Sequence, residues 1–407
     1  MNLVVIGAQW GDEGKGKIVD FISDQADVIV RFSGGANAGH TIVHDDVTYK
    51  LHLIPSGVLY PETRVVLGTG MVIDLDALFE ELEELERSGI SCAGRVLVSD
   101  RAHVVLPRYK QEDIELDRNR INPIGTTGRG IGIAYAVKSA RDGVRIVDLF
   151  DDTFLEDLGS EDRKYIYSRR DRVREMVIDL SAYMNGVRNE NVLLEGAQGA
   201  LLDLDLGTYP YVSSGYSCAA GAALGGGIGP KKIDRVLGVC KAYSTRVGNG
   251  PFPSEFRGDD TTLGDEIREI GREYGVTTGR ARRVGYLDLV ALRYICRTNS
   301  IESIALTHLD VYDAVAAPRV CIAYELDDET LDDFPSSRTA LENARPVTRT
   351  LEGWNTPIGS ISSYDALPDA ARAYVDFVEK FIDTPVDIVS VGYSREQTIV
   401  RRNPWTE

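Results

Sequence analysis

The chain has few cysteines, no paired cysteine motif and no long apolar run. Its five cysteines lie far apart and never form C-x-x-C, so the sequence indicates neither a disulfide framework nor a zinc site. No apolar run approaches the roughly 20 residues that a membrane-spanning helix needs. Met1 is followed directly by a strand-like segment, without a basic leader. We therefore expect a cytoplasmic protein that is neither exported nor inserted into a membrane.

Positive charge is also scarce relative to negative charge. The chain carries 45 basic and 63 acidic residues, for a formal net charge of −18. Generic nucleic-acid binding needs a basic face that displaces counterions from phosphate, and this composition argues against it. We expect small-molecule partners, and an anionic ligand must bind in a locally positive pocket.

What the chain does have is enough apolar sequence for a large core, arranged as alternating strand-like and helix-like segments. It has 407 residues, of which 43% are hydrophobic. Short β-branched runs predict buried strands at 3–6, 27–32, 64–67, 191–194 and 303–306. The alternation predicts an α/β fold, a mostly parallel central sheet with helices on both faces, as one domain over 1–407. Ligand loops are then expected at the carboxyl ends of the strands.

Two segments carry the apolar periodicity of amphipathic helices. Residues 74–88 place one apolar stripe opposite carboxylates, formed by Leu75, Leu78, Phe79 and Leu82. Residues 365–382 have Pro368 near the first turn. Their expected inward face is formed by Ala371, Tyr374, Val375 and Phe377.

A glycine-rich loop follows the first strand and precedes a helix-like pattern that opens near Gly14. In the segment AQWGDEGKGKIVDFI, glycines let backbone N–H groups approach phosphate, and Lys15 or Lys17 adds a full charge. The match to GxxxxGK[ST] fails at Ile18, where a magnesium-binding hydroxyl would stand. The carboxylate of Asp12 could take that metal role instead.

A second polar glycine cluster, RFSGGANAGHT, follows the second strand at 31–41. We expect His40 in a loop and not on an apolar face. Together, Asp12 and His40 supply a candidate general base and a candidate donor towards phosphate.

Six segments in order resemble the signature segments of the adenylosuccinate synthetase family. They are WGDEGKGK (10–17), GGANAGHT (34–41), IGTTGRGIG (124–132), LEGAQGALLDLDLGTYPYV (194–212), KAYSTRVGNGPFP (241–253) and VTTGRARRVGYLD (276–288). The resemblance extends over nearly the whole chain and implies a P-loop-NTPase-like fold with insertions. It also implies a ligase that forms a C–N bond from IMP, L-aspartate and GTP through a 6-phosphoryl-purine intermediate.

The resemblance implies roles for individual residues. Asp12 would remove the proton from purine N1 and contact Mg²⁺ together with Gly39, while His40 would hydrogen-bond the transferred phosphoryl group. Gln198 joins these two as a catalytic residue. The residues implied for phosphate and GTP are Gly11, Gly14, Lys15, Gly39, Thr41, His308, Asp310, Ser390 and Gly392.

The other two substrates have their own implied residues. The purine monophosphate would contact Asn37, Thr127, Ser213 and, from a neighbouring subunit, Arg141, which implies a homodimer. The aspartate substrate would contact Thr277, Thr278, Arg280 and Arg282. Guanidinium groups form bidentate pairs with carboxylates, as a dicarboxylate substrate requires.

Several positions depart from the family pattern. His308 stands where lysine is usual, which leaves GTP or ATP as donor. The segments 130–141 and 213–227 differ around the expected monophosphate site. Viral and archaeal relatives join aspartate to dGMP, so the chain could instead be a 2-aminoadenylosuccinate synthetase, although retained Asp12 favours IMP. A non-catalytic nucleotide-binding regulator and a GTPase switch also stay open, and aspartate-dependent turnover separates both from the ligase.

Overall fold

The computed structural model of the protein describes residues 1–44, 47–275, 279, 281–315 and 317–406. The chain divides into two compact units, each assembled from separate segments. The first contains 1–5, 19–197 and 213–234, and the second contains 6–18, 198–212 and 235–407. The strand β1 (Asn2–Gly7) and the helix α1 (Lys15–Ile22) each contribute residues to both. The expected single domain stays a prediction.

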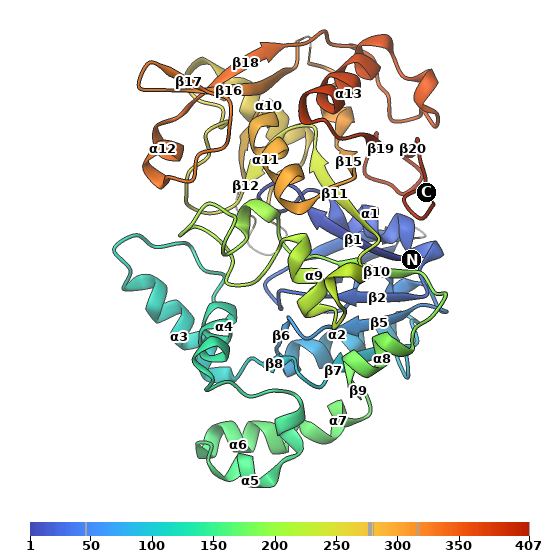
Figure 1. Ribbon diagram of the computed structural model, residues 1–407, viewed down its shortest axis with the longest axis vertical. Coiled ribbons are helices and arrows are strands. Elements are labelled where there is room, and N and C mark those ends of the chain that lie inside the picture. The colour runs from blue at the N-terminus through green and yellow to red at the C-terminus, as the bar shows by residue number, and fades with distance from the viewer. Residues whose placement is uncertain (45–46, 276–278, 280, 316, 407) are drawn as a thin grey trace. The chain divides into compact units, whose positions relative to one another are not determined.

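The first unit contains a parallel sheet in which β1, β10, β2, β5, β7 and β9 follow one another. Figure 1 shows β2, β5 and β7 side by side. The other strands of this unit are β2 (Val28–Arg31), β3 (His40–His44), β4 (Val47–Leu51), β5 (Arg64–Leu67), β6 (Val72–Ile73), β7 (Val96–Ser99), β8 (His103–Val104), β9 (Val177–Ile178) and β10 (Val192–Glu195). Its helices are α2 (Leu75–Arg87), α3 (Pro107–Arg118), α4 (Ile131–Ala140), α5 (Asp152–Glu156), α6 (Ser160–Tyr167), α7 (Arg170–Arg174), α8 (Leu180–Gly186) and α9 (Ala219–Gly225).

The second unit contains the strand order β20-β19-β15-β11, which is parallel except for the β19–β20 pair. A smaller sheet joins β14, β16, β17 and β18. The strands are β11 (Arg235–Lys241), β12 (Ser244–Arg246), β13 (Arg283–Gly285), β14 (Leu287–Asp288), β15 (Ser303–Thr307), β16 (Arg319–Leu326), β17 (Glu329–Leu331), β18 (Arg345–Thr350), β19 (Val386–Ser390) and β20 (Thr398–Val400). The helices are α10 (Thr261–Ile270), α11 (Leu289–Asn299), α12 (Arg338–Asn343) and α13 (Asp369–Ile382).

The predicted α/β class and all five predicted strands are confirmed, with ends that differ by at most one residue. Every residue of β2, β5, β10 and β15 except the half-buried Arg64 is buried, because parallel strands need a helix or other crossover between them, which covers the sheet. The apolar stripe of α2 is buried as expected, and Asp74 caps its first turn by accepting from two backbone N–H groups.

The helix predicted at 365–382 begins later, at Asp369. Pro368 precedes the helix with an extended backbone, and residues 364–366 form a separate 3₁₀ turn. The prediction was therefore wrong for the first four residues. Phe377 is half-buried, and Val378 completes the buried face in its place. Among the described residues, no helix is both long and apolar enough to cross a membrane.

Candidate functional site

The glycine-rich loop joins β1 to α1 through backbone conformations that favour glycine. Gly11 and Gly14 have φ angles of 87° and 83°, and Asp12 between them has a φ of 59°. This left-handed region is open to glycine and tolerated by aspartate. The helix α1 begins at Lys15. The loop thus ends at a helix N-terminus, where backbone N–H groups and the helix dipole favour a bound anion.

Glu13 holds this loop together from inside, a role that the sequence did not reveal. Its Oε1 accepts hydrogen bonds from the backbone N–H groups of Gln9 (3.1 Å) and Gly11 (2.8 Å). Its Oε2 lies 2.7 Å from Lys15 Nζ, and both side chains are buried. A Cβ on Gly199 would lie 2.5 Å from the same carboxylate, so only glycine fits there. The structure therefore pairs the predicted phosphate ligand Lys15 with Glu13.

Lys17 contacts the segment that contains the predicted GTP contacts Ser390 and Gly392. Its Nζ donates to Ser390 Oγ at 2.6 Å and to the carbonyl oxygens of Gly392 and Gln397 at 2.8 and 3.0 Å. Burial lowers the pKa of Lys17 to about 8, although Asp310 opposes the shift. The structure thus brings Ser390 and Gly392 to the glycine loop through Lys17 and not through Lys15.

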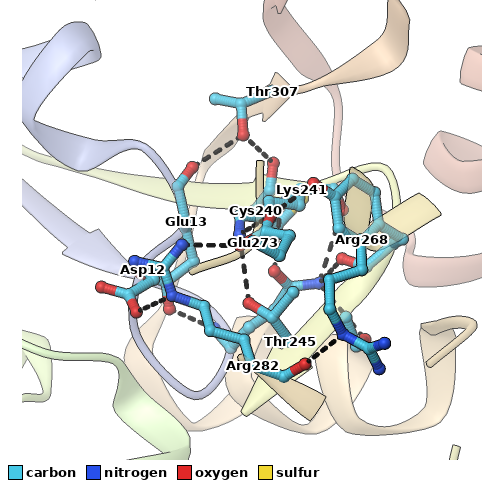
Figure 2. A network of polar contacts seen from close by, with 12 residues as sticks. Asp12, Glu13, Cys240, Lys241, Thr245, Arg268, Glu273, Arg282 and Thr307 are labelled. Carbon is cyan, nitrogen blue, oxygen red and sulfur yellow. Dashed lines mark hydrogen bonds and ion pairs between the residues drawn. The ribbon is translucent and has the colours of Figure 1, made fainter. Parts of the chain in front are cut away.

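A chain of charged side chains leads to Asp12 (Figure 2). Arg282 Nε lies 2.7 Å from Asp12 Oδ2, and Arg282 Nη1 donates to Glu273 Oε2 at 2.7 Å. The other oxygen, Glu273 Oε1, accepts hydrogen bonds from Lys241 Nζ and the Tyr243 hydroxyl. The Asp12 side chain is 37% exposed, whereas Glu273 and Lys241 are 1% and 2% exposed. This charged network therefore runs from a buried lysine to a carboxylate that a ligand can reach.

The cations of the charged network keep Glu273 ionised. Burial alone would raise the pKa of Glu273, but Lys241, His308 and Arg282 outweigh burial and lower this pKa to about 2. Because the folded pKa is below the ordinary 4.5, the carboxylate stabilises the fold above pH 4.5. That stabilisation is lost as the pH falls towards about 2.

The predicted GTP contacts His308 and Asp310 follow β15. Thr307 Oγ1 donates to the backbone carbonyl of Glu13 at 2.7 Å, which ties this segment to the glycine loop. Burial and the nearby Lys241 lower the pKa of His308 to about 3, so its imidazole is neutral at pH 7. Asp310 Oδ1 is buried and has no hydrogen-bond partner among the described residues. A buried open acceptor suits an N–H donor of a ligand such as guanine.

Gln198 lies beside the glycine loop within the second unit. A Cβ on Gly11 would lie 3.9 Å from the backbone carbon of Gln198, and a Cβ on Gly199 would lie 2.4 Å from the nitrogen of Gly11. Asp12, Gln198 and His308 have φ angles of 59°, 55° and 56°. Left-handed backbone at non-glycine residues is uncommon and concentrates at functional sites. These three predicted site residues therefore share a left-handed backbone conformation, which the sequence did not reveal.

The predicted phosphoryl contacts of the first unit are only partly described. Gly39 is exposed and immediately precedes β3. His40 was expected in a loop, but it is the first residue of β3 and pairs with Leu51 of β4. That expectation was wrong because the segment HTIVH forms an antiparallel ladder with VTYKL. The side chains of His40 and Thr41 lie outside the described part of the protein.

The predicted monophosphate contacts lie on separate segments of the first unit. Thr127 and Arg141 are exposed, and Arg141 follows the last residue of α4 as its C-cap, with a φ of 73°. Asn37 and Ser213 are half-buried. Of the predicted aspartate contacts, Arg282 belongs to the charged network. The other three, Thr277, Thr278 and Arg280, lie outside the described residues.

The two segments that depart from the family pattern pack against each other. A Cβ on Gly215 would lie 2.9 Å from the Tyr135 ring, and a Cβ on Gly132 would lie 3.4 Å from Ser214 Oγ. The Tyr135 hydroxyl accepts from the backbone N–H of Gly34 at 3.0 Å. Residues 130–141 and 213–227 are thus neighbours, as the clustering of their differences predicted.

Comparison with known proteins gives one family over nearly the entire chain. The family model described as adenylosuccinate synthetase matches residues 4–399. The adenylosuccinate synthetase of Synechococcus elongatus is 46% identical, covering 99% of this chain and 96% of that protein. The Picosynechococcus sp. adenylosuccinate synthetase is also 46% identical over the same shares.

Solved structures agree with the fold. The fully ligated adenylosuccinate synthetase from Plasmodium falciparum superposes with a TM-score of 0.91 at 38% identity, over 98% of this chain and 99% of that one. The cyanophage S-2L succinoaminodeoxyadenylate synthetase, bound to dGMP and dATP, matches with a TM-score of 0.66 at 19% identity, over 99% and 96%. The second likeness is one of fold alone.

Proposed function

The chain belongs to the adenylosuccinate synthetase family, and from this membership we propose that Asp12 carries the proton transfer of its reaction. The enzyme is a ligase that joins the amine of L-aspartate to IMP, while GTP becomes GDP and phosphate. The observation that carries the proposal is a partly exposed carboxylate on a phosphate-type loop, held by the guanidinium of Arg282.

In the proposed mechanism, Asp12 accepts the proton of purine N1. The electron pair moves to the 6-oxygen, which attacks the γ-phosphorus of the nucleoside triphosphate, and the diphosphate leaves. The aspartate amine then bonds to purine C6, the C6–O bond breaks, phosphate leaves, and the amine loses a proton. Phosphorylation is needed because the 6-oxygen is a poor leaving group and phosphate is a good one. His40 and Gln198 are proposed to contact the reacting phosphoryl and purine groups.

The triphosphate is proposed to bind along the glycine loop and the segments tied to it. Gly11 and Gly14 allow close backbone approach. Lys15 would exchange Glu13 for a phosphate oxygen. The further residues assigned to the nucleotide by family membership are Gly39, Thr41, His308, Asp310, Ser390 and Gly392.

Mg²⁺ is the implied metal, and the partly exposed carboxylate of Asp12 fits it. Among the described residues, no group of three or more acidic, histidine or cysteine side chains could hold a metal by itself. Mg²⁺ is commonly held by one or two carboxylates together with substrate phosphates. Asp12 would supply the carboxylate and Gly39 a further contact. When bound, the metal would neutralise charge on the phosphates.

The remaining substrates are assigned by family membership. Asn37, Thr127 and Ser213 would contact the purine monophosphate, together with Arg141 of a second copy in a homodimer. Thr277, Thr278, Arg280 and Arg282 would bind the aspartate carboxylates. A cytoplasmic location completes the proposal.

The direct test is product mass and phosphate release from the purified protein with Mg²⁺ and aspartate, crossing IMP or dGMP with GTP or ATP. The proposal expects aspartate-dependent turnover with IMP and GTP. Turnover confined to dGMP would contradict IMP as the acceptor, and turnover with ATP alone would contradict GTP as the donor. Phosphate release without aspartate would identify a GTPase, and no turnover with any pair would contradict the ligase.

A further inference from the structure

Glu273 occupies a central position in the charged network, with its two oxygens serving different partners. Oε2 accepts from Arg282 Nη1 at 2.7 Å, and Oε1 accepts from Lys241 Nζ and Tyr243. The backbone also joins these segments, because the Arg282 N–H donates to the Glu273 carbonyl at 2.9 Å. Figure 2 shows Arg282 extending between Glu273 and Asp12. The side chain and the backbone of Glu273 therefore both fix Arg282.

The burial of the pair formed by Glu273 and Lys241 makes this anchor rigid. The side chains are 1% and 2% exposed, and Lys241 Nζ also donates to Thr245 Oγ1 at 3.1 Å. Arg282 is more open, with 14% of its side chain exposed. A buried pair with additional hydrogen bonds has few alternative arrangements, whereas an isolated arginine on a loop has many rotamers. The buried end of the network therefore determines where the open end lies.

The charges also balance along the network. Lys241 and Arg282 contribute two positive charges, and Glu273 and Asp12 contribute two negative charges. Without Glu273, Lys241 would be a buried cation without a carboxylate, and Arg282 would keep only Asp12. Arg282 would then be drawn towards Asp12 and away from the position in which it can meet a substrate carboxylate.

We propose that Glu273 is a positioning residue that, anchored by Lys241, holds Arg282 in place to bind the carboxylate of the aspartate substrate. The inference rests on the proposed function and extends it to two buried residues to which that function gives no role. Glu273 then has two effects: its buried pair with Lys241 stabilises the fold, and its contact with Arg282 positions that guanidinium.

Glu273→Gln combined with Lys241→Met separates these effects. Glu273→Gln alone leaves Lys241 without its carboxylate partner, so we expect a lower Tm. We also expect the KM for aspartate to rise about tenfold or more, because Arg282 loses one charge-assisted contact. Methionine has a stem similar to lysine and needs no partner. We therefore expect the double variant to regain Tm but to keep the raised KM for aspartate, with kcat and the KM for IMP within about threefold of wild type.

Glu269→Gln is the matched control. Glu269 is an exposed carboxylate on α10 that pairs with the Tyr274 hydroxyl outside the charged network. We expect its substitution to leave the Tm and the KM for aspartate unchanged. A second comparison uses Arg282→Lys: if Glu273 acts through Arg282, Glu273→Gln adds nothing to the KM for aspartate in the Arg282→Lys background.

The inference is overturned if the KM for aspartate returns to the wild-type value together with Tm in the Lys241→Met, Glu273→Gln double variant. It is also overturned if the effects of Glu273→Gln and Arg282→Lys multiply. Should Glu273→Gln alone fail to fold, the double variant still decides the question. A wild-type protein without aspartate-dependent turnover would instead contradict the proposed function itself.

Discussion

The charged network of the second unit and the segment around Tyr135 in the first are positioned by different physical means. In the second unit, charged side chains are held by buried ion pairs, as with Glu13 and Lys15 or Lys241 and Glu273. In the first unit, the segment around Tyr135 is held by a neutral hydroxyl and by glycines that allow backbone to approach backbone.

This difference follows from what each region has to do. A group that moves protons or meets phosphate must keep its charge inside the protein, and a buried charge is tolerated only with a partner. A region that has only to provide shape can use close packing, in which no single atom carries much energy but an added methyl group has no space. Charge removal should therefore impair the charged network, and added volume should impair the closely packed glycine segments of the first unit.

The largest effect is expected from Asp12→Asn. Asparagine keeps the shape but cannot accept the purine proton, so kcat should fall by about 10²–10⁴-fold, the usual contribution of a general base. Tm should hardly change, because the Asp12 side chain is partly exposed and Arg282 keeps Glu273. Steady-state kinetics and thermal unfolding measure the two quantities. A variant with wild-type kcat would remove Asp12 from the mechanism.

Gly225→Ala should be the most damaging change in the first unit. An added Cβ would lie 1.9 Å from the carbonyl oxygen of Phe32, which is backbone and has no rotamer to yield. We expect a loss of about 3 kcal/mol or more in the free energy of unfolding, measured by urea denaturation. Gly229→Ala is the control, because no atom lies within 4 Å of its added Cβ and its φ is −71°. Equal losses in the two variants would contradict the packing argument.

The glycine loop and the sheet were predictable because their signals are local. A β-branched run, a glycine cluster and a helix pattern in succession require no knowledge of the rest of the chain. The helix α13 shows the limit of local signals: the sequence pattern predicts a helix from residue 365, yet the helix begins at Asp369, directly after Pro368. His40 was misplaced for a related reason, since its strand exists only through pairing with β4.

The anchors of the site were not predictable because they depend on distant partners. Lys241 and Glu273 are 32 residues apart, and Lys17 meets Ser390 across 373 residues. Neither Glu273 nor Lys241 lies in a segment whose pattern indicates burial of charge. Glu13 carried a faint signal, as a second carboxylate among closely spaced glycines, where a loop with unpaired N–H groups needs an internal acceptor.

Asp288 is a second buried carboxyl group of the second unit, and its pKa is shifted in the opposite direction to that of Glu273. Burial raises the pKa of Asp288 to about 6, and its Oδ1 accepts hydrogen bonds from the Tyr324 hydroxyl and from the N–H of Ala291 in the first turn of α11. Because the folded pKa lies above the ordinary 3.8, the contribution of Asp288 to stability is full below that pH and is lost as the pH rises through about 6.

Asp288→Asn should remove this pH dependence while its side-chain oxygen keeps both hydrogen bonds. The free energy of unfolding of the wild type should fall relative to the variant by on the order of 1–3 kcal/mol between pH 4 and pH 7. Urea denaturation at several pH values measures the difference. Parallel curves for the two proteins would show that Asp288 is not titrating in this range.

Tyr135→Phe is the smallest change and tests whether one neutral hydroxyl organises the first unit's site segment. The hydroxyl donates to the carbonyl of Gly70 at 2.7 Å and accepts from the N–H of Gly34, so its loss leaves two backbone groups without this partner. We expect the free energy of unfolding to fall by about 1–2 kcal/mol. Tyr167→Phe is the control, because that ring is 42% exposed, and it should cost less than about 0.5 kcal/mol. A raised KM for the purine monophosphate in Tyr135→Phe, with the KM for aspartate unchanged, would assign this segment to purine binding. A raised KM for aspartate with an unchanged KM for the purine monophosphate would contradict this assignment. Aspartate is proposed to bind at the charged network of the second unit, which does not include Tyr135.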